Sequence, residues 1–205
     1  MTDARTEILR RIRAAAVPPA PEPPRRHLRH APGLDEHDRP AVLALFTERL
    51  EEYGATVLHA EHAGPAVAEA LAGARSVVAP AGLPDGWTSG WDGEVRFDAP
   101  PLTNDRLDAT DAVLTTCAAA VAESGTLVLD GGPGQGRRAA TLLPDLHVCV
   151  VRAEQVHSAL PGALAVLDPA RPLTFVSGPS ATADIEMIRV KGVHGPRRLV
   201  VVLLP

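Results

Sequence analysis

The sequence predicts an α/β protein built around a parallel β-sheet. Helical segments alternate with short apolar strands in the first half of the main domain, and further apolar strands follow in the second half. This alternation favours parallel pairing, because each crossover helix returns the chain to the same edge of the sheet. Aromatic residues make up only 3% of the 205 residues. The core must therefore consist mainly of Leu, Val and Ala.

An N-terminal helical arm is expected to precede the main domain. Residues 2–16 are typical of a helix, because their apolar residues recur at helical spacing: Ile8, Leu9 and Ile12. Residues 17–40 contain seven prolines, which favours an extended linker. We expect an arm and linker over residues 1–37 and an α/β domain over 38–205. The apolar stripe of the arm could pack on the body, on a second copy in a homodimer, or on another partner.

The first half of the main domain is expected to alternate between helix and strand. Residues 38–54 place apolar side chains on one helical stripe, and 55–60 follow as a strand. A second helix is expected over 64–73 and a second strand over 74–80. Residues 81–100 are rich in Gly and Pro and are expected to form an irregular insertion.

The second half is expected to supply most of the remaining strands. Apolar runs predict these strands: 111–116, 125–132, 172–178 and 197–204, with a turn and a strand over 141–151. Residues 153–167 are typical of a helix that Pro161 breaks or kinks. A further helix is expected to open over 182–186.

The composition also excludes several classes of function. A net charge of −5 argues against bulk nucleic-acid binding. No apolar run approaches the roughly 20 residues of a membrane span, and the N-terminus lacks a signal-peptide pattern, so a cytoplasmic location is expected. Cys117 and Cys149 are expected to be reduced, buried thiols. Two cysteines cannot hold an iron–sulfur cluster, which takes about four ligands, and no metal-site pattern is present.

The segment 122–138 is the first of three that concentrate chemically useful residues. Glu123 stands before a strand, and a Gly-rich run over 131–136 leads to Arg137. Glycine backbone N–H groups can approach an anion closely, and an arginine would complete a phosphate or carboxylate site. The alternative is an ordinary loop between two elements.

The other two segments carry histidines and hydroxyl groups. His147, at the start of a strand, could be a general base or an orienting hydrogen-bond donor, or a structural histidine. Residues 177–186 follow a strand, and ligands of open α/β sheets bind at the carboxyl ends of strands. Helix capping by Ser180 or Thr182 could also explain that segment.

Taken together, these segments resemble the LUD-domain family over about residues 105–204. The motifs that carry the resemblance are Glu123–Leu129, Gly132–Gly134, Arg137, Leu142–Pro144 with His147, Ser177–Ser180, Thr182–Glu186 and Gly192–Pro196.

The resemblance implies a fold and a function. The fold would be a three-layer α/β/α sandwich with a mostly parallel sheet, like that of the sugar-phosphate isomerases and CoA transferases. The chain would be a subunit without a cofactor of its own, in a system that oxidises L-lactate to pyruvate. Two iron–sulfur proteins would be its partners and would carry the clusters. The ligand could be a small carboxylate or a phosphorylated molecule.

Site residues follow from the motifs and the resemblance together. The candidate catalytic residues are Glu123, His147, Asp184 and His194. The candidate ligand-binding residues are Gly125, Thr126, Gly132, Gly134, Arg137, Gly178, Ser180, Thr182 and Glu186. Arg137 is expected to clamp the carboxylate of a 2-hydroxy acid.

Two alternatives remain open. The chain could be an independent enzyme acting on a phosphorylated or acyl small molecule, with Glu123 as base or nucleophile. It could also be a non-catalytic binding or regulatory module.

Overall fold

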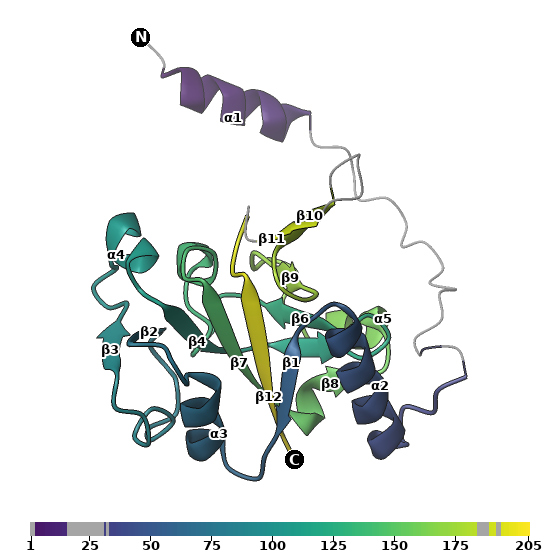
Figure 1. Ribbon diagram of the computed structural model, residues 1–205. Helices are drawn as coiled ribbons and strands as arrows, with labels where there is room; N and C mark the ends of the chain where they lie inside the picture. Colours follow the sequence, from purple (N-terminus) through teal and green to yellow (C-terminus); the bar gives the residue numbers. More distant parts are fainter. Residues whose placement is uncertain (1–2, 16–30, 32, 184–188, 192–193) are drawn as a thin grey trace.

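A parallel β-sheet forms the centre of the protein. The computed structural model describes residues 3–15, 31, 33–183, 189–191 and 194–205. Within these ranges six strands pair in the order β1-β12-β7-β4-β2-β3, and all five pairings are parallel (Figure 1). Their bounds are β1 Thr56–His59, β12 Arg198–Leu204, β7 Leu146–Arg152, β4 Ala112–Thr116, β2 Ser76–Ala79 and β3 Glu94–Phe97. The predicted α/β class is confirmed.

A smaller sheet packs against the large one. Its strand order is β8-β5-β6-β9, and β6 is antiparallel to both of its neighbours. The bounds are β8 Val156–His157, β5 Ala119–Val121, β6 Thr126–Leu129 and β9 Thr174–Val176. The helix expected over 153–167 is therefore wrong in its first part, which forms the 3₁₀ helix η2 (Ala153–Gln155) and β8. The helix α5 (Leu160–Ala165) begins only at Leu160, with Pro161 in its first turn, because proline is tolerated in a first turn but not inside a helix.

Helices cover both faces of the large sheet. On one face α3 (Ala63–Ala70) packs on the sheet, and on the other α2 (Arg39–Glu52) packs together with the small sheet (Figure 1). The outer face of the small sheet is covered by α5. The helix α4 (Asn104–Asp108) and the 3₁₀ helix η1 (Arg138–Thr141) cover the region of β2 and β4 that the small sheet leaves open.

The central strand β7 shows how the sequence divides its side chains between the two faces. Leu146, Val148 and Val150 face the α3 layer, whereas Cys149 and Val151 face α2 and the small sheet. This alternation follows from the pleat of a strand. His147 has the same parity as Cys149 and therefore faces the small sheet. Cys149 and its neighbour Cys117 are free and buried, as the sequence predicts.

Helix α1 (Ala4–Ala14) forms as expected, with Asp3 accepting a hydrogen bond from the Arg5 N–H at 3.3 Å. None of its residues is buried, and Ile8 and Ile12 are 57% and 62% exposed. Helix α2 begins at Arg39, where Asp38 accepts a hydrogen bond from the Ala41 N–H. Leu34 already packs against the core, and the domain boundary expected after residue 37 stays a prediction. That the apolar stripe of α1 packs on the body, on a second copy or on another partner stays a prediction.

Two further expectations are corrected by short strands. The insertion at 81–100 contains β3, an edge strand of the large sheet. The helix expected to open at Thr182 is wrong, because Ala181–Ala183 form β10, which pairs antiparallel with β11 (Arg189–Lys191). The local sequence did not distinguish a strand from a helix here, because a stretch of only three residues of alternating size fits a strand as well as a helical turn. Asp184 and Glu186 lie outside the described residues.

The turn between β5 and β6 packs tightly on the backbone of α2, and glycine makes this possible. Gly125 has φ +54°, and a Cβ there would lie 2.8 Å from the carbonyl carbon of Arg49 and from the Leu50 nitrogen. We expect Gly125→Ala to lower the free energy of unfolding by about 2 kcal/mol, measured by urea denaturation. Gly73→Ala is the matched control, because Gly73 has φ +84° but open space around it. Equal losses of stability in the two variants would show that the close contact with α2 does not account for the effect of Gly125→Ala.

Candidate functional site

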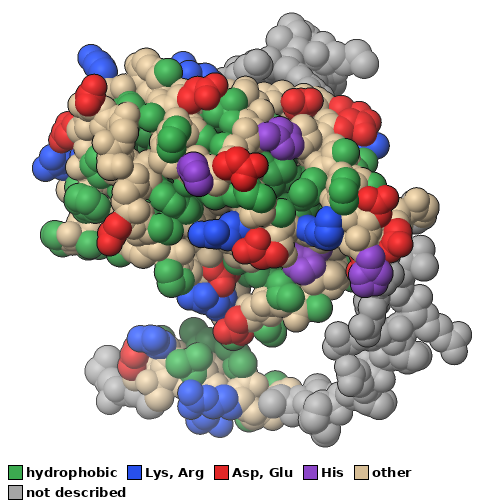
Figure 2. All heavy atoms as spheres, turned by 90° about the horizontal axis from the view of Figure 1, so that it is seen from below, with side chains coloured by type: hydrophobic (Ala, Val, Ile, Leu, Met, Phe, Trp, Pro, Cys, Tyr) green, Lys and Arg blue, Asp and Glu red, His purple; other side chains and the backbone are tan. Residues whose placement is uncertain are grey.

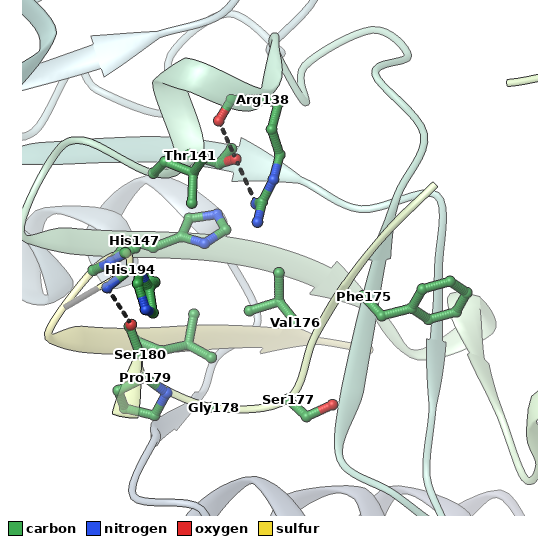
Figure 3. Close-up of a pocket in the computed structure, with 14 residues that line it drawn as sticks. Arg138, Thr141, His147, Phe175, Val176, Ser177, Gly178, Pro179, Ser180 and His194 are labelled. Carbon is green, nitrogen blue, oxygen red and sulfur yellow. Dashed lines mark hydrogen bonds between the residues drawn. The ribbon is translucent and has the colours of Figure 1, made fainter. Parts of the chain in front are cut away.

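A cavity of about 170 Å³ lies where the small sheet meets the large one (Figure 3). Three segments far apart in the sequence form its walls: the end of β9 with 177–180, the approach to β7, and the approach to β12. The cavity thus opens at the amino-terminal ends of the parallel strands. Residues 177–180 follow a strand as expected, but that strand, β9, belongs to the antiparallel small sheet, so this cavity does not lie at the carboxyl end of a parallel strand.

His147 forms the floor of this cavity. Its side chain is 1% exposed, and its Nε2 lies 2.7 Å from the Thr115 hydroxyl on β4. Burial, and next the positive charge of Arg138, lower the pKa of His147 to about 4. The imidazole is therefore neutral at neutral pH, with one nitrogen a donor and the other an acceptor. Since Thr115 takes Nε2, Nδ1 is the nitrogen left for a ligand.

Arg138 stands at the rim of the cavity. It is exposed, and Figure 3 shows its guanidinium reaching toward the imidazole of His147. Its side-chain contact is one long hydrogen bond, 3.5 Å from Nη1 to the Thr141 hydroxyl. Within the described part of the chain, no carboxylate lies within 4.0 Å of this guanidinium. Arg138 can therefore receive an anion at the mouth of the cavity.

Arg137 is placed very differently from its neighbour. Its Nε and Nη2 donate to the two carboxylate oxygens of Asp98 at 2.8 and 3.1 Å, and Nη2 also donates to the Leu102 carbonyl. Asp98 is buried, with its side chain 5% exposed. Arg137 lines an adjoining cavity of about 430 Å³, which shares Arg138 and Thr141 with the first. The carboxylate it binds here is the chain's own, and a clamp on a ligand stays a prediction.

The glycine-rich loop uses its N–H groups within the protein. Gly132 N–H donates to the Asp130 carboxylate at 2.9 Å, and Gly134 N–H donates to the Ala81 carbonyl at 2.8 Å. These two N–H groups are therefore not available to an anion in this structure. The loop packs closely on β4, since a Cβ on Gly134 would lie 3.2 Å from the Thr116 side chain.

Glu123 lies apart from His147, on an exposed turn of the small sheet. Its Oε1 accepts a hydrogen bond from the Leu160 N–H at 3.1 Å, at the start of α5. Thr126, also expected in the site, is buried, and its hydroxyl lies 2.7 Å from the Ser177 hydroxyl. Thr126 thus fixes the segment that lines the cavity without lining it.

Three other expected residues do meet at the cavity: Gly178, Ser180 and His194. The Ser180 hydroxyl accepts a hydrogen bond from the His194 N–H at 3.2 Å, so the two lining loops are tied together (Figure 3). Gly178 has φ +98°, and a Cβ there would lie 2.7 Å from the Cβ of Tyr53. Thr182 belongs to β10.

Sequence reasoning missed three residues of the site: Thr115, Arg138 and Thr141. Thr115 carried a usable signal, because it is a hydroxyl residue inside an otherwise apolar strand. No local signal distinguished Arg138 from Arg137, because the two arginines differ in which of them binds Asp98.

The family follows from comparison with known proteins. A family model described as the LUD domain matches residues 98–204, which is more than half of the chain. The chain belongs to the LUD-domain family. Lactate utilization protein C of Deinococcus radiodurans is 46% identical to it over 200 residues, which cover 94% of this chain and 88% of that protein. The resemblance seen in the sequence is confirmed.

Other LUD-domain relatives match over shorter stretches. Lactate utilization protein C of Bacillus pumilus is 39% identical over 92 residues, covering 41% of this chain and 38% of that protein. Among solved structures, a DUF162 family protein from Deinococcus radiodurans is 41% identical, with a TM-score of 0.69 over 82% of this chain and 99% of that chain. The fold is therefore that of a solved relative.

The surface gives two further observations. None of the helices in the described ranges is long and apolar enough to cross a membrane. Figure 2 shows acidic, basic and histidine side chains interspersed over the face it presents. The absence of a nucleic-acid partner, expected from the net charge of −5, stays a prediction.

Proposed function

We propose that this LUD-domain protein is a cluster-free subunit of an L-lactate utilization system. The observation that carries the proposal is the 46% identity to Lactate utilization protein C of Deinococcus radiodurans over 94% of the chain. At that identity and coverage the similarity extends over most of both chains and is not confined to a single motif. The name of that relative supports a role in lactate utilization for this chain.

The finer part of the proposal concerns electrons. Oxidation of L-lactate to pyruvate releases two electrons and two protons, so an acceptor must take the electrons. We propose that two iron–sulfur partner proteins do so in the cytoplasm. An iron–sulfur cluster takes about four cysteine ligands, whereas this chain has two. Both are buried, and the neighbouring thiol of Cys149 together with burial raises the pKa of the Cys117 thiol.

The alternative of an independent enzyme gains no support from the position of its proposed base. Glu123 is exposed and bound to the start of α5, away from His147. The cavity at His147 is the better candidate for any ligand of this chain, since it combines a buried neutral imidazole with a guanidinium that has no carboxylate partner among the described residues.

A deletion strain of the native bacterium tests the proposal. Without the gene, growth on L-lactate should fail while growth on glucose continues, and a plasmid copy should restore it. A tagged copy isolated from lactate-grown cells should bring down two cysteine-rich proteins that contain iron. Normal growth of the deletion strain on L-lactate would contradict the proposed role. Growth failure with recovery of the chain alone would instead favour the independent enzyme or the binding module.

A further inference from the structure

We infer that the cavity between Arg138 and His147 binds a small 2-hydroxy or 2-oxo monocarboxylate, the chemical class of lactate and pyruvate. The choice of this class rests partly on the proposed function. The geometry contributes independently through four features of the cavity, which are its size, its charge, its floor and its apolar wall.

The size of the cavity limits the part of a ligand that it encloses to a small group. Its volume is about 170 Å³. Sites for drug-sized molecules usually enclose about 300–1,000 Å³. A compact three-carbon acid therefore suits this cavity better than a nucleotide or an acyl-CoA.

The charge of the cavity points to a monoanion. Three arginines lie along the two adjoining cavities, and two of them already hold a carboxylate: Arg137 holds Asp98, and Arg171 holds Asp130 at 2.7 Å. Arg138 is the third, and no acidic partner holds it within the described chain. A guanidinium binds a carboxylate through two parallel N–H···O bonds. A phosphate, with about −1.5 to −2 charges, would exceed the single permanent positive charge of the described lining.

The floor of the cavity supplies a hydrogen-bond partner for the 2-hydroxyl or 2-oxo group of the acid. The neutral imidazole of His147 can donate to or accept from a 2-hydroxyl or 2-oxo group through Nδ1. The hydrogen bond from Thr115 to Nε2 fixes the ring orientation. Because Arg138 lies over the imidazole, a carboxylate on Arg138 places the adjacent carbon toward His147 (Figure 3).

Part of the remaining wall is apolar and suits a short alkyl group, whereas Thr141, Ser177, Ser180 and His194 supply polar groups elsewhere in the lining. Leu142, Val176 and Leu199 line the cavity beside His147. The methyl group of a three-carbon acid would contact these side chains, whereas a second carboxylate there would be desolvated without a partner. This wall therefore selects monocarboxylates over dicarboxylates.

Ligand titration of the purified full chain tests the inference. Thermal shift and calorimetry would use L-lactate, pyruvate, acetate, succinate and inorganic phosphate, each at about 10 mM, which reveals any Kd near 1 mM. L-lactate or pyruvate should raise the Tm more than the other three anions. Arg138→Gln should weaken that binding at least about tenfold, since it removes a charge-assisted pair.

Arg197→Gln is the matched control. Arg197→Gln removes the same charge, but Arg197 is 62% exposed, pairs with Asp145 and does not line the cavity. Its affinity for the acids should stay within about twofold of the wild type. No binding of either acid by the wild-type chain, or equal losses in the two variants, would overturn the inference.

Growth separates this inference from the proposed function. If the deletion strain fails on L-lactate and the Arg138→Gln gene restores full growth, the cavity is not the ligand site, while the proposed function stands. If the deletion strain grows normally, the proposed function fails, and the titrations alone decide whether the cavity binds these acids.

Discussion

Replacing Asp98 with Ala should lower the free energy of unfolding by about 3 kcal/mol. The change removes a buried carboxylate that accepts two hydrogen bonds from Arg137 and a third, at 2.7 Å, from the Leu102 N–H. Breaking a buried ion pair costs about 3–5 kcal/mol, because the remaining charge is left without a partner. The lower end applies here, since the Arg137 side chain is 35% exposed and can still reach water. Urea denaturation measures the loss.

The matched control is Glu94→Ala. Glu94 pairs with Arg96 at 2.7 Å, almost the same distance, but its side chain is 57% exposed. An exposed pair contributes about 0–1 kcal/mol. The double variant of Asp98 and Arg137 should lose less than the sum of the two single changes. Equal effects of Asp98→Ala and Glu94→Ala would show that Asp98 does not hold Arg137 as described.

Lowering the pH from 6.5 to 4 should cost about 3 kcal/mol of stability through His147 alone. Its pKa is about 4 in the folded protein against 6.5 in the unfolded chain. Between these values the unfolded state binds the proton and the folded state does not, so protonation favours unfolding. The loss begins as the pH falls through 6.5 and is complete near 4. Urea denaturation at several pH values between 7.5 and 4 measures it.

A His147→Gln variant isolates this contribution. Its stability should depend less steeply on pH in the same window, because glutamine does not titrate. His157 also has a lowered pKa, mainly from burial, and contributes to the slope of both proteins. Asp111 has a pKa below 3.8, because backbone N–H groups bind its carboxylate, so its contribution is lost only at lower pH. If the free energy of unfolding of His147→Gln depended on pH as steeply as that of the wild type, the conclusion that His147 is buried and neutral would be contradicted.

Most of the main sheet could be predicted from the sequence because its strands are apolar runs, except for the edge strand β3, which contains Glu94 and Arg96. β2 and β12 follow this rule, being nearly all Val, Leu and Ala. The small sheet could not be predicted in full, because β8 has two residues and β5 has three, too few for a period to appear. Its partners also lie far apart in the chain, as with β6 and β9.

In the site, too, some features can be predicted from the local sequence, whereas others depend on residues far away in the chain. His147 can be predicted as a candidate because an imidazole at the start of an apolar strand is conspicuous in the local sequence. The difference between Arg137 and Arg138 depends on Asp98, 39 residues before Arg137, and no local pattern encodes it. The surroundings of Glu123 could not be predicted for the same reason, because its partner, the Leu160 N–H, lies 37 residues later.

The position of β12 has a consequence for how the protein is made. This strand comes after all the others in the chain, yet it lies inside the sheet between β1 and β7. During translation the ribosome releases β12 last, so the earlier strands emerge with a vacant place beside β7. Leu199 of β12 and the loop before it also wall the cavity. A nascent chain therefore completes its main sheet and the wall of this cavity at the same late stage.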